Sequence, residues 1–153
     1  MSSRRQARRT ALVLLYQWDL TGQPLGSLYL GDIDPFALEL ARPVVDNAPA
    51  LDARITEAAE DWTADRLGAV ERNVLRLAVQ ELETGETPRE VAIAEAVALS
   101  KRYASPDAAR LVNGILGRIA QWDSPNGTVA TPLVEPQRDS PPRGQSRESD
   151  ERS

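Results

Sequence analysis

The sequence predicts an all-α protein, and three observations support this prediction. The run V-E-R-N-V-L-R-L-A-V-Q-E-L over residues 70–82 places apolar side chains over more than half of a helix surface. Hydrophobic residues make up 41% of the chain and aromatic residues only 5%. Such a core of Ala, Leu and Val suits packed helices better than sheets. Several segments also carry start and stop signals for helices. With 153 residues, the chain fits one domain.

The residue types that the chain lacks exclude several classes of function. It has no cysteine, which excludes disulfides, thiolate catalysis and cysteine metal sites. It has no histidine, the commonest general base and metal ligand. Phosphate-binding glycine loops and nucleophile motifs are also absent. We therefore expect that the chain is not an enzyme and binds neither a metal nor a cofactor. Without an apolar run of membrane length or a signal peptide, the chain is expected to be cytoplasmic.

Charge is unevenly distributed along the chain. The formal net charge is −5, yet residues 1–9 contain four arginines and no acidic residue. Residues 10–60 contain two basic residues and eight acidic ones. A basic end on an acidic body indicates a local site for an anionic ligand.

The first helix is predicted to begin at Ser3, with Gln6 as its capping-box partner, and to end at Gly22. Residues 21–32, which contain three glycines and one proline, are typical of a loop. Helical spacing predicts the buried face of this helix to be Ala7, Ala11, Leu14, Leu15 and Trp18.

A second helix is predicted to start at Asp34 and Pro35, a cap followed by a first-turn proline. Pro43 lacks a backbone donor, so we expect it to kink or break this helix near Arg42. A third helix is predicted to enter through Pro49. Its apolar stripe comprises Leu51, Ile55, Ala58, Ala59 and Trp62.

The central helix is predicted to follow Gly68 and to end at Gly85. Glu71 and Glu81 interrupt its apolar side. In the first turn, the Glu71 carboxylate favours the positive end of the helix dipole, which is the structural interpretation of this residue.

Two further helices are predicted after the central one. Thr87 is expected to cap the first, with Pro88 and Glu90 completing the start signal. Ser105 is expected to cap the second. The helical period passes through Gly114, which we interpret as a close approach of two helix backbones.

The composition changes at Asp123. Pro, Ser, Gly, Arg and acidic residues dominate residues 123–153. Such a segment buries too little apolar surface to offset its loss of entropy on ordering. The sequence therefore predicts a helical domain over residues 1–122 and a disordered tail over residues 123–153.

The N-terminal arginines are the strongest local signal of function. Cations are unfavourable at the start of a helix because of its dipole, so four arginines there oppose local stability. Helical spacing places Arg5, Arg8 and Arg9 off the predicted buried face, on an exposed stripe. Tyr16 falls between Arg5 and Arg9 in angular position, further along the same stripe. A line of cations with an aromatic ring is the pattern that single-stranded nucleic acid requires. The alternatives are a solvated helix end and a half-buried tyrosine.

A second group of basic residues surrounds Ser105. It consists of Lys101, Arg102 and Arg110. The first two also fit a structural role, compensating the dipole at a helix C-terminus.

Three segments resemble the family of the transcription antitermination factor NusB. They are R-R-Q-A-R-R-T-A-L-V-L-L-Y-Q-W, the central V-E-R-N-V-L-R-L-A-V-Q-E-L, and V-A-I-A-E-A-V-A-L-S-K-R-Y followed by L-V-N-G-I-L-G-R-I. They occur in the family's order over residues 3–120, which makes the resemblance specific.

The resemblance implies about seven helices in two small packed bundles. It implies binding of boxA-type single-stranded RNA together with NusE, a ribosomal protein of the small subunit. This pair would join the antitermination complex that keeps RNA polymerase processive on ribosomal RNA operons. Some relatives also form homodimers, so self-association is a further possibility.

The resemblance also assigns roles to individual residues. Glu71 and Asp107 match acidic positions associated with the partner protein and the adjacent RNA surface. The chain departs from the family pattern at Pro43, Gln80 and Ala94. It also departs at Leu111, where an aromatic residue is usual. The positions implied to contact RNA are Arg4, Arg5, Arg8, Arg9, Tyr16 and Arg110.

Two alternatives of other classes follow from the same residues. One is a helical interaction scaffold that does not bind RNA. The other is an accessory domain of an RNA methyltransferase, because NusB-like domains also precede such enzymes. The polar tail, where a cofactor-binding domain would follow, argues against the second alternative.

Overall fold

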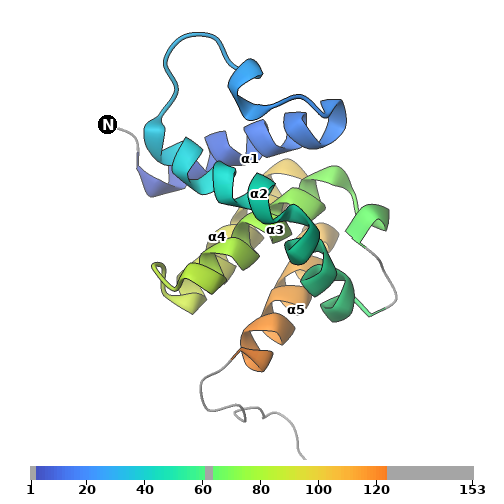
Figure 1. Ribbon diagram of the computed structural model, residues 1–153. Coiled ribbons are helices and arrows are strands. Elements are labelled where there is room, and N and C mark those ends of the chain that lie inside the picture. Colours follow the sequence, from blue (N-terminus) through green and yellow to red (C-terminus); the bar gives the residue numbers. More distant parts are fainter. Residues whose placement is uncertain (1–2, 61–63, 124–153) are drawn as a thin grey trace, which may run out of the picture. The chain divides into compact units, whose positions relative to one another are not determined.

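The computed structural model describes residues 3–60 and 64–123, and this part of the chain contains helices and no strand. The α-helices are α1 (Arg4–Thr21), α2 (Pro35–Ala58), α3 (Ala69–Thr84), α4 (Arg89–Tyr103) and α5 (Pro106–Trp122) (Figure 1). Two 3-10 turns lie between them, η1 (Leu25–Ser27) and η2 (Ala64–Arg66). The all-α prediction is confirmed. The predicted burial of Trp62 and the predicted disordered tail beyond Asp123 fall outside the described residues.

The prediction of about seven helices in two bundles is wrong, because the described residues form five α-helices. One cluster of buried side chains, not two, draws on all five. The predicted break near Arg42 is absent, and α2 continues through Pro43 and Pro49. Each proline removes one backbone hydrogen bond and crowds the preceding turn. Tertiary burial along one face of α2 opposes this cost. The face consists of Ala37, Ala41, Val44, Ala48, Leu51, Ile55 and Ala58.

The ends of α1 are formed by local chemistry, as predicted. The Ser3 hydroxyl accepts a hydrogen bond from the Gln6 backbone N–H at 3.0 Å. Gly22 ends the helix in the left-handed region, with φ of 73°, and its N–H donates to the Trp18 carbonyl. Asp34 caps α2 in the same manner by accepting from the Phe36 N–H at 3.0 Å. These caps place the N-terminal arginines on the first two turns of α1.

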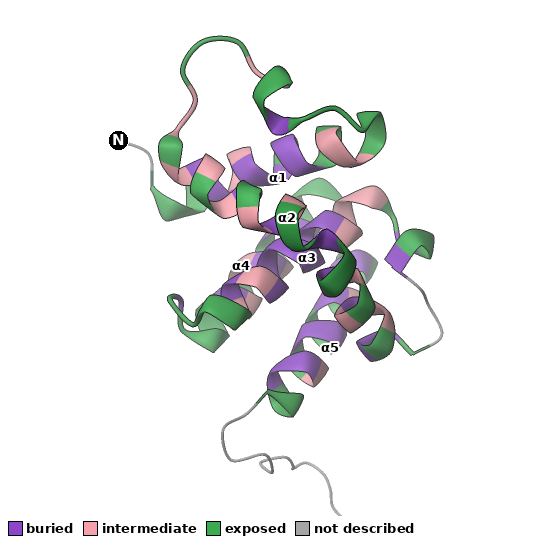
Figure 2. Cartoon of the chain, viewed as in Figure 1, coloured by how far each residue is buried: buried purple, intermediate pink, exposed green. Residues whose placement is uncertain are grey.

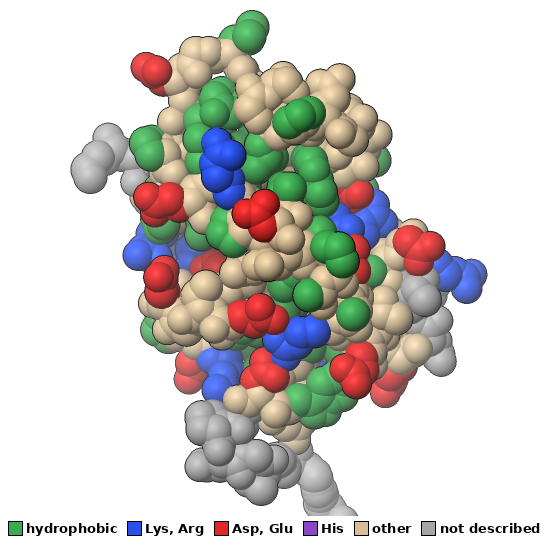
Figure 3. Space-filling model, viewed as in Figure 1, with side chains coloured by type: hydrophobic (Ala, Val, Ile, Leu, Met, Phe, Trp, Pro, Cys, Tyr) green, Lys and Arg blue, Asp and Glu red, His purple; other side chains and the backbone are tan. Residues whose placement is uncertain are grey.

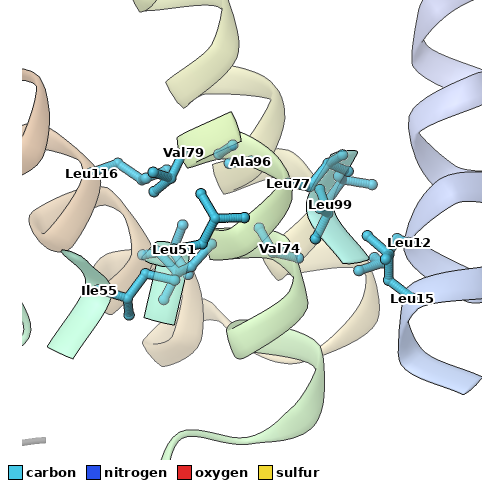
Figure 4. Packing of buried hydrophobic residues seen from close by; sticks show 14 of the residues in the cluster. Leu12, Leu15, Leu51, Ile55, Val74, Leu77, Val79, Ala96, Leu99 and Leu116 are labelled. Atoms are coloured by element: carbon cyan, nitrogen blue, oxygen red, sulfur yellow. The ribbon is translucent and has the colours of Figure 1, made fainter. Parts of the chain in front are cut away.

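The central helix α3 packs against α1, α2 and α4 (Figure 1). Every residue from Asn73 to Val79 is buried, so α3 is the most enclosed helix of the core (Figure 2). Leu12 and Leu15 of α1 point toward the α3 and α4 side chains, among them Leu77 (Figure 4). This packing explains the broad apolar surface in the sequence of α3, because one helix must face several neighbours.

Buried polar residues of α3 join it to α1 and α2. The Asn73 amide donates to the Asp19 carboxylate and accepts from Arg76. Arg76 also binds both oxygens of Asp52 at 2.7 Å. Its guanidinium carbon lies 5.5 Å from the centre of the Trp18 ring. These contacts satisfy polar groups that would be costly to bury alone.

The later helix starts confirm one predicted cap and correct another. Ser105 caps α5 by accepting from the Ala108 N–H at 3.0 Å. Thr87 does not cap α4, because its hydroxyl donates to the Glu81 carboxylate instead. Gly114 is exposed, and a side chain there would meet nothing within 4 Å. The predicted close approach of two helix backbones at Gly114 is therefore wrong.

None of the described helices is both long enough and apolar enough to cross a membrane.

Candidate nucleic-acid interface

The first turn of α1 carries two arginines in different settings. The Arg4 guanidinium carbon lies 4.8 Å from the centre of the Phe36 ring, in cation–π geometry. Arg5 is exposed and binds Glu95 of α4 through two atoms. Its Nη2 lies 3.0 Å from one carboxylate oxygen and its Nε lies 3.3 Å from the other. Both arginines therefore have defined partners, while much of the Arg5 side chain faces solvent.

Arg8 differs from its predicted place on an exposed stripe. It is only 4% exposed, and its Nε and Nη2 bind the buried carboxylate of Glu81 at 2.7–3.2 Å. The physical reason is that α1 packs on both α2 and α3, which widens its buried arc. Glu81 on the apolar side of α3 was the available signal, because a buried carboxylate requires a partner.

The arginine pKa values shift in the direction that these ion pairs require. The hydrogen bond and negative charge of Glu95 raise the pKa of Arg5. The hydrogen bond to Glu81 raises the pKa of Arg8 against the opposing effect of burial. Burial alone would lower the pKa of Arg76, but Asp52 and Asp19 outweigh it and raise that pKa. All three guanidinium groups are therefore charged at every physiological pH.

An open groove of about 520 Å³ lies at the N-terminal end of α1. Its basic lining consists of Arg4, Arg5 and Arg8, and its acidic lining consists of Glu86 and Glu95. The remaining lining residues are Ser3, Thr87, Pro88 and Val91. The groove brings three of the predicted RNA-contacting residues together. We call it the arginine groove.

Tyr16 lines a second groove, which has a volume of about 350 Å³. The side chain is 38% exposed, like that of Tyr103 on the same groove at 39%. The other lining residues are Leu12, Val13, Gln17 and Val70. The two grooves share no lining residue, so the structure does not place Tyr16 beside the three arginines. We call this second site the tyrosine groove.

The remaining predicted RNA-contacting residues, Arg9 and Arg110, line neither groove. Arg9 is half-buried on α1. Arg110 is exposed on α5 and pairs with Asp107 one turn earlier. On the face in view, acidic and basic side chains are interspersed, without a large patch of one sign (Figure 3). Such a surface attracts an anion through particular side chains more than through a broad field.

Glu71 is partly buried in the first turn of α3. A Cβ atom added to Gly68 would lie 2.6 Å from the Glu71 Oε1 atom. The carboxylate therefore occupies the space above the helix start, where it complements the helix dipole. Val70, the residue before it, lines the tyrosine groove. Glu71 itself lines neither groove.

Comparison with known proteins gives the family. The model of the NusB family matches residues 5–121. The transcription antitermination protein NusB of Solibacter usitatus is 38% identical over 142 residues, covering 85% of this chain and 97% of the relative.

Solved structures agree with this match. T. maritima NusB has a TM-score of 0.70 and 34% identity, covering 82% of this chain and 95% of that chain. The structure of antitermination factors NusB and NusE in complex with dsRNA gives a TM-score of 0.67 and 35% identity. It covers 76% of this chain and 94% of the matched one.

These matches confirm the resemblance found in the sequence. The family is one of transcription antitermination factors, which are RNA-binding proteins and not enzymes. With more than half of its length matched by the family model, the chain belongs to the NusB family.

Proposed function

We propose that this chain acts in the cytoplasm as a transcription antitermination factor that binds RNA together with NusE. The observation that carries the proposal is the arginine groove, in a chain whose relative was solved with NusE and dsRNA. We further propose that the RNA is single-stranded and of boxA type. In this proposal the pair joins the RNA polymerase complex that transcribes ribosomal RNA operons.

In this proposal the site residues have three roles, which are phosphate contact, base stacking and binding of the protein partner. Arg4, Arg5 and Arg9 contact phosphates from α1, and Arg110 contacts them from α5. Arg8 acts from the floor of the arginine groove, where its Nε and Nη2 are already bound to Glu81. Phosphate contacts of this kind position an RNA without reading its sequence.

The remaining residues serve base and partner recognition. Tyr16 stacks on a base from the tyrosine groove, because an exposed ring offers a face to any base. Glu71 and Asp107 face the protein partner.

The test is binding of labelled RNA by the full chain, with and without NusE, at low and moderate salt. A boxA-like RNA and a scrambled RNA of equal length are compared by fluorescence anisotropy. We expect affinity to fall steeply with salt, because phosphate contacts release counterions. We also expect NusE to increase the preference for the boxA-like RNA. Equal, weak binding of both RNAs with NusE present would contradict the proposal.

A second candidate function is an interaction scaffold without RNA binding. The observation that favours it is the neutralisation of two arginines by Glu81 and Glu95. This candidate predicts tight NusE binding and no salt-dependent RNA binding in the same experiment. Light scattering would show whether the free chain forms a homodimer and whether RNA changes its oligomeric state.

A further inference from the structure

Two ion pairs three residues apart on α1 differ sharply in their access to solvent. The Arg8 and Glu81 side chains are 5% and 8% exposed, whereas the Arg5 and Glu95 side chains are 67% and 15% exposed. Both arginines line the arginine groove. One pair therefore belongs to the core, and the other lies where a ligand reaches it.

The buried pair does not exchange its partner easily. Separating Arg8 from Glu81 would leave two buried charges without compensation. Glu81 also accepts a hydrogen bond from the Thr87 hydroxyl at 3.1 Å. Among the described residues, no acceptor binds Nη1 of Arg8, although Nε and Nη2 are both engaged. Arg8 thus stays bound to Glu81 and forms a fixed part of the groove lining.

The exposed pair uses the edge of Arg5 that also recognises phosphate. Nε and Nη2 point to the two oxygens of Glu95, in the fork geometry that carboxylate and phosphate share. A phosphate that binds this edge must therefore take the place of the carboxylate. Because the Arg5 side of this pair faces solvent, a ligand reaches its guanidinium without opening the core.

We propose that Glu95 is an affinity-determining residue. Its carboxylate occupies the edge of Arg5 that an RNA phosphate would bind, and RNA binding displaces this carboxylate. This inference rests on the proposed RNA-binding function. Glu95 thereby lowers the affinity of the arginine groove for RNA. In the part of the chain that the structure describes, Glu86, the second acidic residue of the groove, forms no ion pair with Arg5, so the competition is assigned to Glu95.

The experiment is a double-mutant cycle of Arg5 and Glu95 on the full chain, read by RNA affinity at one salt concentration. We expect Glu95→Gln to increase the affinity about two- to fivefold, the range of an exposed ion pair. Arg5→Ala should weaken binding. In the Arg5→Ala background, Glu95→Gln should have almost no effect, because the competed cation is gone.

Glu90→Gln is the matched control. It removes the same charge from an exposed position of the same helix that does not line the arginine groove. We expect its gain in affinity to be clearly smaller than that of Glu95→Gln. Melting temperatures of all variants should remain close to that of the wild type.

Three outcomes would overturn the inference while RNA binding by the wild type stands. They are an unchanged or reduced affinity of Glu95→Gln, an equal gain in the Arg5→Ala background, and an equal gain from Glu90→Gln. Absence of RNA binding by the wild type, with and without NusE, would instead overturn the proposed function, and this inference with it.

Discussion

The Arg8 guanidinium meets the Glu81 carboxylate inside the protein, with Nη2 2.7 Å from Oε1 and Nε 2.9 Å from Oε2. A buried pair is costly to break because the remaining charge has no partner. We therefore expect Glu81→Leu or Arg8→Met alone to lower the free energy of unfolding by about 3–5 kcal/mol. Urea unfolding curves measure this loss.

The double variant Arg8→Met with Glu81→Leu serves as the control. Replacing both charges by apolar side chains removes the unpaired charge, so we expect most of the stability to return. A double variant as unstable as the sum of the two single variants would contradict this account of the pair.

Arginines that contact phosphates should set the salt dependence of RNA binding. Replacing Arg5 and Arg9 by glutamine should weaken all single-stranded RNAs alike and flatten the plot of log affinity against log salt. Filter binding at several salt concentrations measures the slope. The control is Arg89→Gln, since Arg89 is exposed on α4 and lines neither groove. A slope unchanged by the double replacement would exclude these two arginines as phosphate contacts.

Tyr16→Ala should act differently from the arginine variants. Loss of a stacked base costs about 1–3 kcal/mol of RNA binding and leaves the salt slope nearly intact. The sequence resemblance implies an aromatic residue at the position of Leu111, so we expect Tyr16 to contribute more of the stacking. Tyr16→Phe keeps the ring and should keep the affinity. If Tyr16→Ala weakens NusE binding and leaves RNA affinity unchanged, the tyrosine groove binds the protein partner instead of a base.

Glu71→Lys should weaken NusE binding while the chain stays folded. The change reverses a charge in the first turn of α3 and places a cation at a helix start, which itself costs a few tenths of a kcal/mol to about 1 kcal/mol. Glu90→Lys imposes the same penalty on the first turn of α4 and is the matched control. Calorimetric titration with NusE separates the two variants. Equal NusE affinity for both would remove Glu71 from the interface.

Gly68→Ala tests the same region without changing charge. The added Cβ atom would lie within 3.0 Å of three atoms of the Glu71 carboxylate group and would displace this group. We expect weaker NusE binding with only a small loss of stability.

Deletion of residues 123–153 should leave both the melting temperature and RNA affinity almost unchanged. The prediction rests on composition, because this segment offers no apolar periodicity with which to dock. Thermal unfolding of the full and shortened chains is the measurement. A clear fall in melting temperature, or in RNA affinity, would show that the helical domain does not end near residue 122.

Local chemistry was sufficient to predict most helix ends from the sequence. Ser3, Asp34 and Ser105 cap helices as expected, and Gly22 and Gly85 end them in the left-handed region. Each of these features depends on residues within one turn, so the sequence contains all the necessary information.

The features that sequence reasoning missed depend on distant partners. Pro43 was expected to break a helix, yet the apolar face of α2 is buried on both sides of it. Arg8 was expected at the surface, but its acceptor Glu81 lies 73 residues away. The Thr87 hydroxyl donates a hydrogen bond to the same carboxylate instead of capping α4. Helical periodicity does not reveal which tertiary contact a polar side chain will choose.

The carboxylate of Glu81 also bears on the order of folding events. It joins α1 and the segment before α4 to α3, and the Arg8 contact closes a long stretch of chain. Contacts of high sequence separation carry a large loop-closure entropy and tend to form late. We therefore expect Glu81 variants to unfold faster with little change in folding rate. The buried ion pair would then act as a latch that prolongs the lifetime of the native state.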